Sequence, residues 1–323
     1  MDLRAFVTGA GGFVGQHLTA ALHAAGWQIV GAGRSHPSTG LPSGAKFHEG
    51  NILDDGFLQG IFASQHFDVV FHLAGLDASA SATELYRVNV LGTSKLLDAV
   101  RALVRPELKV MLLGSSAQYG ASKDNPITEE SNADPVTSYG VSKTCSDMMG
   151  RAMFRETGQH VCRARAFNIV GPGLDAGSLP GRVVEQIAEA ELAQSSAIVN
   201  TGDLSAFRDF IDVRDVVTGL ISIVTNGDAG EAYNLCSGQA IQANSLVESL
   251  VRMSRVSLSV EARSRSFAGV DVPYQRGSFE KLRKRTGWSP RIALENSLAD
   301  ALDQRRYELS SKIVRVVAGE HFP

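Results

Sequence analysis

The sequence predicts an α/β fold, a doubly wound parallel sheet with a smaller, partly interleaved C-terminal lobe. Short apolar runs alternate with helical patterns along the first two-thirds of the 323-residue chain. Runs that are apolar on both faces, with helices between them, are typical of a parallel sheet whose two faces are covered. Right-handed crossovers between successive strands then give the doubly wound arrangement.

Each expected strand is a short apolar run, and each expected helix carries the apolar periodicity of a helix that is buried on one face. In chain order, the runs that predict strands are Leu3–Val7, Gln28–Ala32, Asp68–Leu73, Val110–Leu113 and Val161–Phe167. The helices predicted between them are Val14–Ala25, Val88–Leu103 and Tyr139–Glu156. After the Gly/Pro-rich stretch GPGLDAGSLPG, further helices are predicted at Arg182–Ala193, Ser245–Ser254 and Leu294–Arg306.

The order of elements is less regular after Gly171, which indicates a second structural unit. There, DFIDVRDVVTGLISIV predicts a short strand that leads into a helix, and EAYNLCSG predicts a strand and a turn. We expect a first domain over residues 1–170, with 210–237 interleaved into it, and a lobe over 171–209 and 238–323. No repeat of fixed period and no low-complexity segment occurs.

Composition and charge exclude several classes of function. The formal net charge is −3 and the pI about 6.3, so we expect no binding of nucleic acid or of an anionic membrane. Cys145, Cys162 and Cys236 have neither a paired nor a metal-ligand spacing, so we expect no disulfide, no metal and a reducing compartment. The sequence has no signal-peptide pattern and no long apolar run, so we expect a cytoplasmic protein without a membrane span.

A glycine-rich turn follows the first expected strand and opens the first expected helix. In VTGAGGFVGQHL, Gly9, Gly12 and Gly15 form a G-x-x-G-x-x-G pattern, and Phe13 and Val14 begin the helix. Such glycines permit a tight turn, close approach of backbone to a pyrophosphate, and close packing of helix on strand. The helix N-terminus adds N–H groups and a favourable dipole. We therefore expect dinucleotide binding; the alternative is a glycine-rich turn without a ligand.

The residues after the second expected strand bear on which dinucleotide binds. An NAD site usually has Asp or Glu there to hold the ribose 2′-OH. No acidic residue occurs between Gln16 and His48, and Arg34 stands where the carboxylate would be. Because arginine suits a 2′-phosphate, we expect NADP(H) as the preferred cofactor and NAD(H) as the second choice. The alternative for Arg34 is a solvated surface arginine.

Two later stretches are expected to line the cofactor. Asn51 and Ile52 follow the third strand, and we expect them in the adenine pocket. The small residues at the end of FHLAG would let the cofactor lie across Leu73, Ala74 and Gly75. We expect His72, which precedes them, to be packed in the strand rather than catalytic.

Candidate catalytic residues come from one strand end and one helix. Ser115 and Ser116 end the strand in LLGSSAQYG, at the carboxyl edge where open α/β sheets bind ligands. In TSYGVSK, the i, i+4 spacing puts Tyr139 and Lys143 on one helical face. A Tyr-x-x-x-Lys pattern is common by chance, so only the surrounding motifs can indicate whether this pair is catalytic.

Those neighbours resemble a known family. The glycine turn, FHLAG, NVLGTSKLL, GSSAQYG, YGVSK and RAFNIVGPG occur in order along the chain. As a set that covers essentially the whole chain, they resemble the extended short-chain dehydrogenase/reductases, in the nucleotide-sugar branch. The resemblance implies a Rossmann domain and a catalytic triad of Ser115, Tyr139 and Lys143, with Ser116 able to assist. It also implies that Asn89 lies behind the active site on the cofactor side; otherwise Asn89 is a polar residue in a helix–helix contact.

The chemistry of ketone reduction needs these residue types. A ketone accepts hydride at carbon only if its oxygen is protonated or hydrogen-bonded as charge develops. Tyr139 would supply that proton, and Ser115 would orient the substrate oxygen. Lys143 would lower the pKa of Tyr139 by its charge and would also hold the nicotinamide ribose.

Motifs in the second half are similar to those of GDP-4-keto-6-deoxy-D-mannose reductases, which form GDP-D-rhamnose for deoxysugar and polysaccharide or lipopolysaccharide biosynthesis. The similarity implies reduction of the 4-keto group of a GDP-linked 4-keto-6-deoxyhexose. It implies substrate contacts by Ser116, Asn168, Val183, Arg208 and Arg276. Phe207 replaces a basic residue that usually precedes the arginine, and Arg263 and Arg265 are alternatives to Arg276.

Three other functions stay open. A 4,6-dehydratase usually has Asp-Glu directly after the triad hydroxyl, where this chain has Ser116 and Ala117. A 4-epimerase shares the triad but retains NAD tightly, which the Arg34 region disfavours. A non-catalytic NADP-sensing protein would usually have lost part of the triad. The resemblance also implies a homodimer, and the apolar stripe Cys145, Met148, Met149 and Met153 is either its seam or part of the core.

Overall fold

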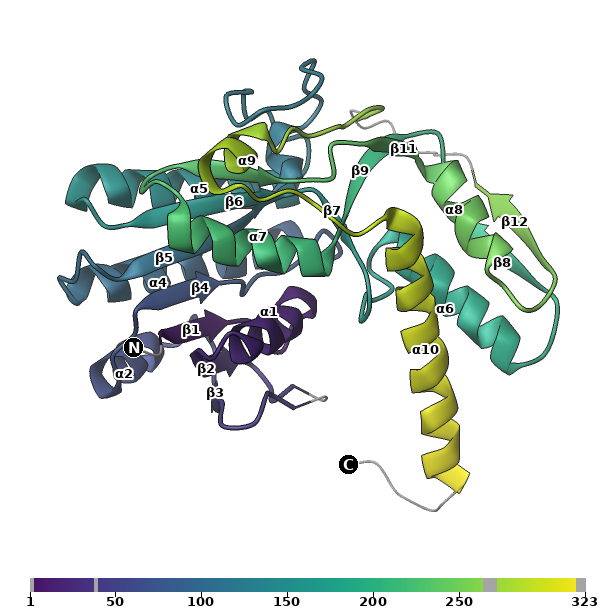
Figure 1. The fold of residues 1–323 in the computed structure, drawn as a ribbon, viewed down its shortest axis with the longest axis horizontal. Helices are drawn as coiled ribbons and strands as arrows, with labels where there is room; N and C mark the ends of the chain where they lie inside the picture. The colour runs from purple at the N-terminus through teal and green to yellow at the C-terminus, as the bar shows by residue number, and fades with distance from the viewer. Residues whose placement is uncertain (1–2, 38–39, 264–271, 318–323) are drawn as a thin grey trace.

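A seven-stranded parallel sheet forms the centre of the larger unit (Figure 1). The structure is a computed structural model that describes residues 3–37, 40–263 and 272–317. Every strand pair in this sheet is parallel, and the spatial order is β10-β6-β5-β4-β1-β2-β3. The strands are β1 (Arg4–Thr8), β2 (Gln28–Gly33), β3 (Lys46–Glu49), β4 (Val69–His72), β5 (Lys109–Ser115), β6 (Val161–Ala166) and β10 (Ala232–Leu235). The predicted doubly wound α/β fold is confirmed.

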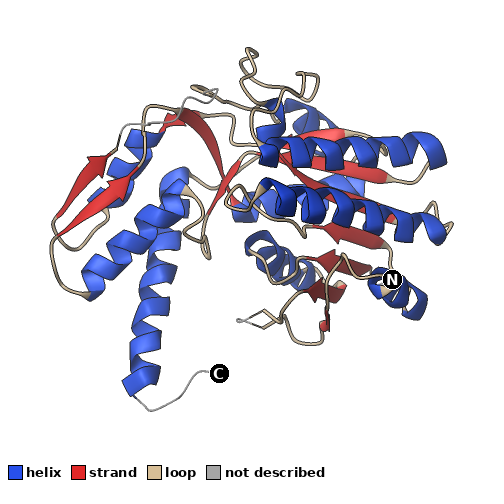
Figure 2. Cartoon of the chain, turned by 180° about the vertical axis from the view of Figure 1, so that it is seen from behind, coloured by secondary structure: helices blue, strands red, loops and turns tan. Residues whose placement is uncertain are grey.

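Helices cover both faces of this sheet, as Figure 2 shows from behind. One face carries α1 (Phe13–Ala24), α7 (Val213–Asn226) and α9 (Glu280–Thr286). The other carries α2 (Phe57–Ser64), α4 (Gly92–Ala102) and α5 (Ser138–Thr157). The short α3 (Ala82–Leu85) and a π-helical turn η1 (Tyr86–Leu91) lead into α4, and a 3₁₀ turn η2 (Ser116–Tyr119) follows β5. Two apolar cores result, one on each side of the strands.

The lobe lies beyond one edge of the sheet (Figure 1). Its strands form a three-stranded sheet, β11-β9-β7, and a parallel pair, β12-β8. They are β7 (Asn168–Val170), β8 (Ala197–Thr201), β9 (Phe207–Asp212), β11 (Ala240–Gln242) and β12 (Leu258–Ala262). A third apolar core lies between the lobe strands and its helices α6 (Leu179–Leu192), α8 (Ala243–Arg252) and α10 (Leu294–Val317).

The packing of β10, α7 and α9 bears on where the predicted domain boundaries lie. Because β10 pairs with β6, and α7 packs against α1, we propose that 210–237 belongs mainly with the sheet domain. Within the predicted lobe, however, α9 packs on α7 and β10, and Leu282 and Trp288 are part of the sheet domain's core. The chain therefore returns to the sheet domain a second time, before α10 re-enters the lobe.

Helix α5 carries Tyr139 and Lys143 and has clear start and stop signals. Thr137 caps its N-terminus, since the Thr137 hydroxyl accepts a hydrogen bond from the Gly140 N–H at 3.1 Å. Gly158, at φ 73°, ends it in the left-handed conformation that favours glycine. Of the expected methionine stripe, Met153 is buried in the core, Met149 packs against it, and Met148 is exposed. In the described ranges, no helix is both long and apolar enough to span a bilayer.

Candidate active site

The candidate site lies at the carboxyl edge of the parallel sheet, on the side where the lobe stands (Figure 1). Because the strands are parallel, the segments that follow β1, β2, β4 and β5 all leave from this edge. Gly9, Arg34, Leu73 and Ser115 lie at or just beyond these four strand ends. Residues that are far apart in sequence are therefore brought to one edge, facing the lobe.

The glycine turn has the geometry of a phosphate cradle. Gly9 has φ 70°, and a Cβ there would lie 2.8 Å from the main-chain N of Ala74. A Cβ on Gly15 would lie 2.1 Å from the Gly9 carbonyl oxygen, so only glycine lets α1 approach the turn. Among the described residues, no side chain caps the N-terminus of α1. The turn thus offers open backbone and a helix dipole to a pyrophosphate, and it fits the dinucleotide that the sequence predicts.

Thr8 is a residue of this region that sequence reasoning missed. Its hydroxyl accepts the Ala74 N–H at 3.2 Å and lies 2.8 Å from Nδ1 of His72. Thr8 therefore joins the end of β1 to the end of β4, the two strands whose following loops would hold the cofactor. The signal was a threonine directly before the first glycine, but nothing in the local pattern identified its partners.

The other residues that were expected to line the cofactor differ in their surroundings. Asn51 caps its own turn by accepting the Leu53 N–H at 3.1 Å. Ile52 is only 6% exposed and packs against Gly92 of α4, so most of its side chain belongs to the core. Ala74 and Gly75 lie in the loop after β4, and a Cβ on Gly75 would lie 3.3 Å from Nζ of Lys143. The small residues of this loop therefore let it pass close to the lysine.

Arg34 is exposed at the end of β2, next to the glycine turn. We expect Arg34→Asp to raise KM for NADPH by about 10-fold or more relative to KM for NADH, because a charge-assisted contact to the 2′-phosphate becomes a repulsion. Steady-state kinetics with both cofactors measure this ratio. The same charge reversal at exposed Lys284 in α9 is the control and should leave the ratio unchanged. An unaltered ratio in Arg34→Asp would reject the assignment.

Asn89 is the polar centre of a contact between three segments. Its side-chain oxygen accepts the Leu76 N–H at 2.7 Å, and its amide donates to the Leu76 carbonyl at 3.1 Å and to the Ser142 hydroxyl at 2.9 Å. Its own carbonyl, in the π-helical turn, accepts hydrogen bonds from the hydroxyls of Thr93 in α4 and Ser146 in α5. Asn89 thus makes the helix–helix contact given as its alternative, and it fixes the loop after β4; direct contact with a cofactor stays a prediction.

The three predicted triad residues come together. Ser115, at the end of β5, lies next to Tyr139, in the first turn of α5, and its side chain lowers the pKa of Tyr139 against the effect of burial. Nζ of Lys143 donates to the Leu113 carbonyl at 3.2 Å and lies 5.9 Å from the centroid of the Tyr139 ring. Strand β5 therefore supplies both the serine and the carbonyl that positions the lysine.

The electrostatics of the tyrosine differ from the sequence-based expectation. Burial raises the pKa of Tyr139, the hydrogen bond with Ser115 opposes this, and the charge of Asp77 adds to it. The expected lowering by Lys143 is not found, since the lysine is itself desolvated and lies beside the ring. Without cofactor, Tyr139 is thus a protonated phenol at neutral pH, which is the form that a general acid needs.

Burial lowers the pKa of Lys143 to about 8, which leads to a pH-dependence prediction. Because the ammonium is the form that would hold the ribose, we expect kcat/KM for NADPH to fall as the pH rises through about 8. His72 is a poor candidate for this limb, since burial first and the charge of Lys143 second lower its pKa to about 3. Lys143→Arg should move the fall to higher pH. A profile that stays flat well above the pKa of Lys143 would contradict the prediction.

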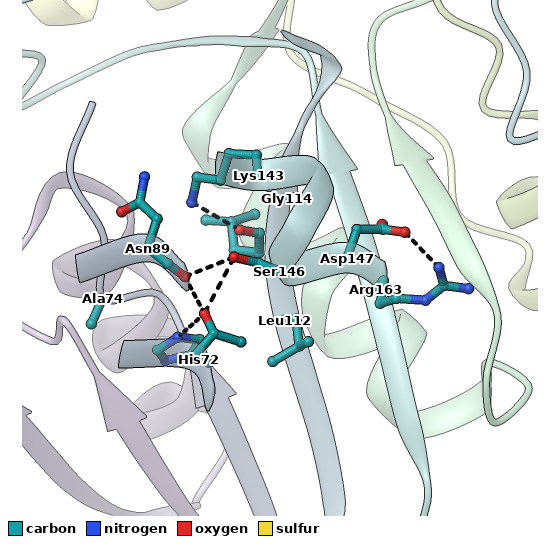
Figure 3. A pocket seen from close by; sticks show the side chains of 11 residues that line it. His72, Ala74, Asn89, Leu112, Gly114, Lys143, Ser146, Asp147 and Arg163 are labelled. Atoms are coloured by element: carbon teal, nitrogen blue, oxygen red, sulfur yellow. Dashed lines mark hydrogen bonds and ion pairs between the residues drawn. The ribbon is translucent and has the colours of Figure 1, made fainter. Parts of the chain in front are cut away.

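A small closed cavity lies behind Lys143 (Figure 3). Its lining includes His72, Asn89, Ser146, Asp147 and Arg163, and its volume of about 10 Å³ is room for about one water molecule, far too small for a sugar. His72 is buried there, with Nε2 3.0 Å from the Thr93 hydroxyl, so its expected packing role is confirmed. This cavity is therefore not the place where a sugar would bind.

A buried ion cluster that the sequence did not reveal fixes α5 on β6. Asp147, one turn after Lys143, accepts hydrogen bonds from Arg163 at 2.6 Å and from Arg165 at 3.0 Å (Figure 3 draws the first). Burial opposes ionisation, but the hydrogen bonds and charges of the two arginines hold the pKa of Asp147 below its usual range. Removing one partner of such a buried group is strongly destabilising, so these residues support the position of the lysine.

The predicted substrate residues divide into two groups. Asn168 and Arg208 lie on neighbouring strands of the lobe sheet, and the Asn168 amide donates to the Asp209 carbonyl at 2.8 Å. Arg276 is half-buried, and its Nε has no hydrogen-bond partner among the described residues. These three stay predictions for phosphate contacts. Arg263 is exposed at the end of β12, and Arg265 lies outside the described residues.

Two other substrate predictions need correction. Val183 is 0% exposed inside the lobe core, so its side chain cannot reach a ligand. Ser116 is also buried, and its hydroxyl donates to Oε1 of Gln275 at 3.0 Å, while the Gln275 amide donates to the Ser116 carbonyl at 3.1 Å. Ser116 therefore ties the end of β5 to the segment before Arg276 and is not available to assist Ser115.

Chemistry that depends on a metal ion or on a reactive thiol has little support in the described ranges. No group of three or more His, Cys, Asp or Glu side chains is arranged there to hold a metal ion. Cys145, Cys162 and Cys236 are free thiols, and burial raises the pKa of Cys162 to about 12. The arrangement is that of a dinucleotide cradle beside a proton donor.

Comparison with known proteins gives consistent matches along the chain. Residues 5–236 match the family described as NAD dependent epimerase/dehydratase. The chain is 32% identical over 305 residues to the GDP-6-deoxy-D-mannose reductase of Pseudomonas aeruginosa, which covers 92% of this chain and 95% of that protein. It is 28% identical over 301 residues to the dTDP-6-deoxy-L-talose 4-dehydrogenase (NAD(P)(+)) of Kitasatospora kifunensis, covering 92% and 94%.

A solved structure matches to a similar extent. The structure of RMD from Pseudomonas aeruginosa complexed with NADPH superposes with a TM-score of 0.83 at 30% identity. The match covers 95% of this chain and 99% of that one, so it includes both the sheet domain and the lobe.

Proposed function

The chain belongs to the NAD dependent epimerase/dehydratase family, and we propose that it reduces the 4-keto group of a GDP-linked 4-keto-6-deoxyhexose, with NADPH preferred over NADH. The observation that carries the proposal is the likeness, over 92% of the chain, to a GDP-6-deoxy-D-mannose reductase. The joined Ser115 and Tyr139 and the open glycine turn support it. On this proposal the product is of the GDP-D-rhamnose type.

The proposed chemistry assigns one task to each residue. The bound dinucleotide would supply the hydride that adds to the carbonyl carbon of the sugar. Tyr139, protonated because burial raises its pKa, donates its proton to the carbonyl oxygen as negative charge develops there. Ser115 hydrogen-bonds to that oxygen and orients it. Lys143, held by the Leu113 carbonyl, stays beside Tyr139 and binds the ribose.

The glycine turn and the strand ends hold the dinucleotide on this proposal. Gly9, Gly12 and the start of α1 would hold the pyrophosphate, and Arg34 would pair with the 2′-phosphate. On the substrate side, Arg208 and Arg276 pair with the diphosphate, and Asn168 hydrogen-bonds to it. Arg276 suits this role because it is half-buried and its Nε has no hydrogen-bond partner among the described residues.

Each of the three alternative functions fits the described site less well than a reductase does. A dehydratase would need carboxylates directly after Ser115, where this chain has Ser116, which is bound to Gln275, and Ala117. A 4-epimerase needs the cofactor to be retained through both half-reactions, whereas an exposed Arg34 suits an exchangeable NADPH. A non-catalytic sensor would not need Ser115 and Tyr139 to be placed next to each other.

The direct test follows NADPH oxidation with GDP-4-keto-6-deoxymannose. We expect turnover, and slower turnover with the matching dTDP-linked ketosugar. Parallel reactions with UDP-glucose and with GDP-mannose plus NADP⁺ test the epimerase and dehydratase alternatives. Conversion in either of these, with none in the first, would replace the proposed function; NADPH binding without turnover of any ketosugar would support a sensor.

We also propose that the protein is a homodimer in the cytoplasm. Met148 of α5 is 62% exposed, and Leu91 and Tyr86 on the adjoining π-helical turn are exposed as well. Exposed large apolar side chains on neighbouring helices suit an interface better than solvent. The three free thiols suit a reducing compartment.

The prediction for the dimer is that Met148→Glu shifts the mass measured by light scattering from twice that of the chain to the mass of one chain. A buried carboxylate without a partner at the seam accounts for the shift. The control is Tyr307→Glu, a change on an exposed side chain of α10. A wild-type protein that is already a monomer would reject the proposal.

A further inference from the structure

Asp77, in the loop after β4, is a carboxylate whose charge acts on Tyr139 and that none of the assigned roles uses. Its Oδ1 accepts hydrogen bonds from the Ser79 N–H at 2.8 Å and from the Ser79 hydroxyl at 2.5 Å. Its Oδ2 points the other way and lies 3.2 Å from the position that a Cβ on Gly177 would occupy. Oδ2 accepts no hydrogen bond from the residues that the structure describes, and Asp77 is exposed.

The backbone around Asp77 is fixed against the catalytic helix. Both main-chain groups of Leu76 are bound by the side chain of Asn89, at 2.7 and 3.1 Å. Gly75 approaches Nζ of Lys143, since a Cβ there would lie 3.3 Å away. The negative charge of Asp77 also reaches Tyr139, whose pKa it raises. Asp77 therefore stands beside the proton donor, on the loop that runs past the lysine.

The opposite wall comes from the lobe. Gly177 belongs to the segment between β7 and α6, and its neighbour Asp175 is already engaged, because Oδ1 of Asp175 accepts the Gly177 N–H at 2.8 Å. Asp77 Oδ2 thus lies where the loop after β4 meets the lobe, and it accepts no hydrogen bond from the residues that the structure describes.

The chemistry of the substrate indicates what this acceptor meets. A carboxylate repels a diphosphate, so Asp77 faces the sugar end of the molecule, and the arginines of the lobe face the phosphates. A sugar whose ketone lies at Tyr139 presents its neighbouring hydroxyl within a bond or two of that ketone. Hydroxyl-to-carboxylate hydrogen bonds are among the strong ones in proteins.

We propose that Asp77 Oδ2 accepts a hydrogen bond from the sugar hydroxyl next to the reacting carbonyl, and that it thereby selects sugars in which this hydroxyl is free. The inference rests on the proposed function and assigns to that site a specificity-determining residue. A sugar that is deoxygenated or acylated at this position would leave the carboxylate without its partner and is disfavoured.

The test compares Asp77→Ala with Ser79→Ala, which removes a hydrogen bond to Oδ1 but leaves Oδ2 in place. Calorimetry in the presence of NADP⁺ measures the affinity for GDP-mannose, a stable hexose with the same neighbouring hydroxyl, and for GDP. We expect Asp77→Ala to weaken GDP-mannose binding about 10- to 100-fold, the range for a hydrogen bond to a charged group, and to leave GDP binding unchanged. Ser79→Ala should match the wild type for both.

Kinetics supply the second readout. With GDP-4-keto-6-deoxymannose, Asp77→Ala should lose kcat/KM while KM for NADPH stays at the wild-type value. With the analogue that lacks the neighbouring hydroxyl, the wild type and Asp77→Ala should be equally slow. The inference is overturned if the wild type and Asp77→Ala bind GDP-mannose with equal affinity. It is also overturned if Asp77→Ala loses as much affinity for GDP as for GDP-mannose. If the wild type neither binds nor reduces any GDP-linked sugar, the proposed function itself is overturned, whatever the result for Asp77→Ala.

Discussion

Replacement of Tyr139 by phenylalanine lowers kcat by at least about 100-fold and leaves NADPH affinity intact, because general acid catalysis usually contributes that much. The ring remains beside Lys143, so the change removes only the hydroxyl of Tyr139. Stopped-flow measurement of hydride transfer at saturating substrate, together with a fluorescence titration of NADPH, separates the chemical step from binding.

The matched control for this change is Tyr274→Phe. Tyr274 is a partly exposed tyrosine of the lobe whose ring stacks near Phe207, with centroids 5.7 Å apart. Loss of a hydroxyl there should leave kcat close to the wild-type value. If Tyr139→Phe also keeps near-normal kcat, another group donates the proton and the role given to Tyr139 is wrong.

The second large effect is expected at the phosphate cradle. Gly15→Ala should abolish measurable NADPH binding, since the new Cβ would lie 2.1 Å from the Gly9 carbonyl oxygen, a backbone atom that cannot rotate away. Helix α1 must move off the turn, at a cost of about 1–3 kcal/mol or more in folding stability as well. Fluorescence titration with NADPH and thermal unfolding measure the two effects.

Gly11→Ala is the control within the same turn. A Cβ on Gly11 meets nothing closer than Pro37 at 3.5 Å, which is ordinary van der Waals contact. We expect this variant to bind NADPH and to unfold like the wild type. Gly15→Ala that binds NADPH normally would show that the cofactor does not lie over this turn.

The sheet was predictable because its strands are apolar on both faces. The observed β1, β2, β4, β5 and β6 match the expected strands to within two residues or so at their ends. Helix α2 was missed because it is short, with only the eight residues Phe57–Ser64. The strand before Asn51 was expected without bounds, because the side chains of β3 are partly exposed. Of the lobe strands only β9 was expected, as the short strand that leads into α7, and the others are too short to carry a clear periodicity.

The site was predictable where a residue's role depends on its own segment. Ser115, Tyr139 and Lys143 are brought together because a strand end and a helix start are fixed by local pattern. Ser116 was misjudged because its partner, Gln275, lies far along the chain in the lobe. Val183 was misjudged because its burial depends on how α6 packs in the lobe core. The pKa of Tyr139 could not be foreseen either, because burial outweighs the charge expected of Lys143.

The central claim is that this site passes a hydride from exchangeable NADPH to the ketone carbon of a nucleotide-linked sugar. The most direct measurement uses NADPH that carries deuterium at the transferred position, with GDP-4-keto-6-deoxymannose as substrate, and locates the label by NMR. The account predicts deuterium on C4 of the product, in one stereochemical orientation, with one NADPH consumed per sugar. Product without deuterium at C4 would mean that the hydride comes from a retained cofactor or from the sugar itself, and would contradict the account.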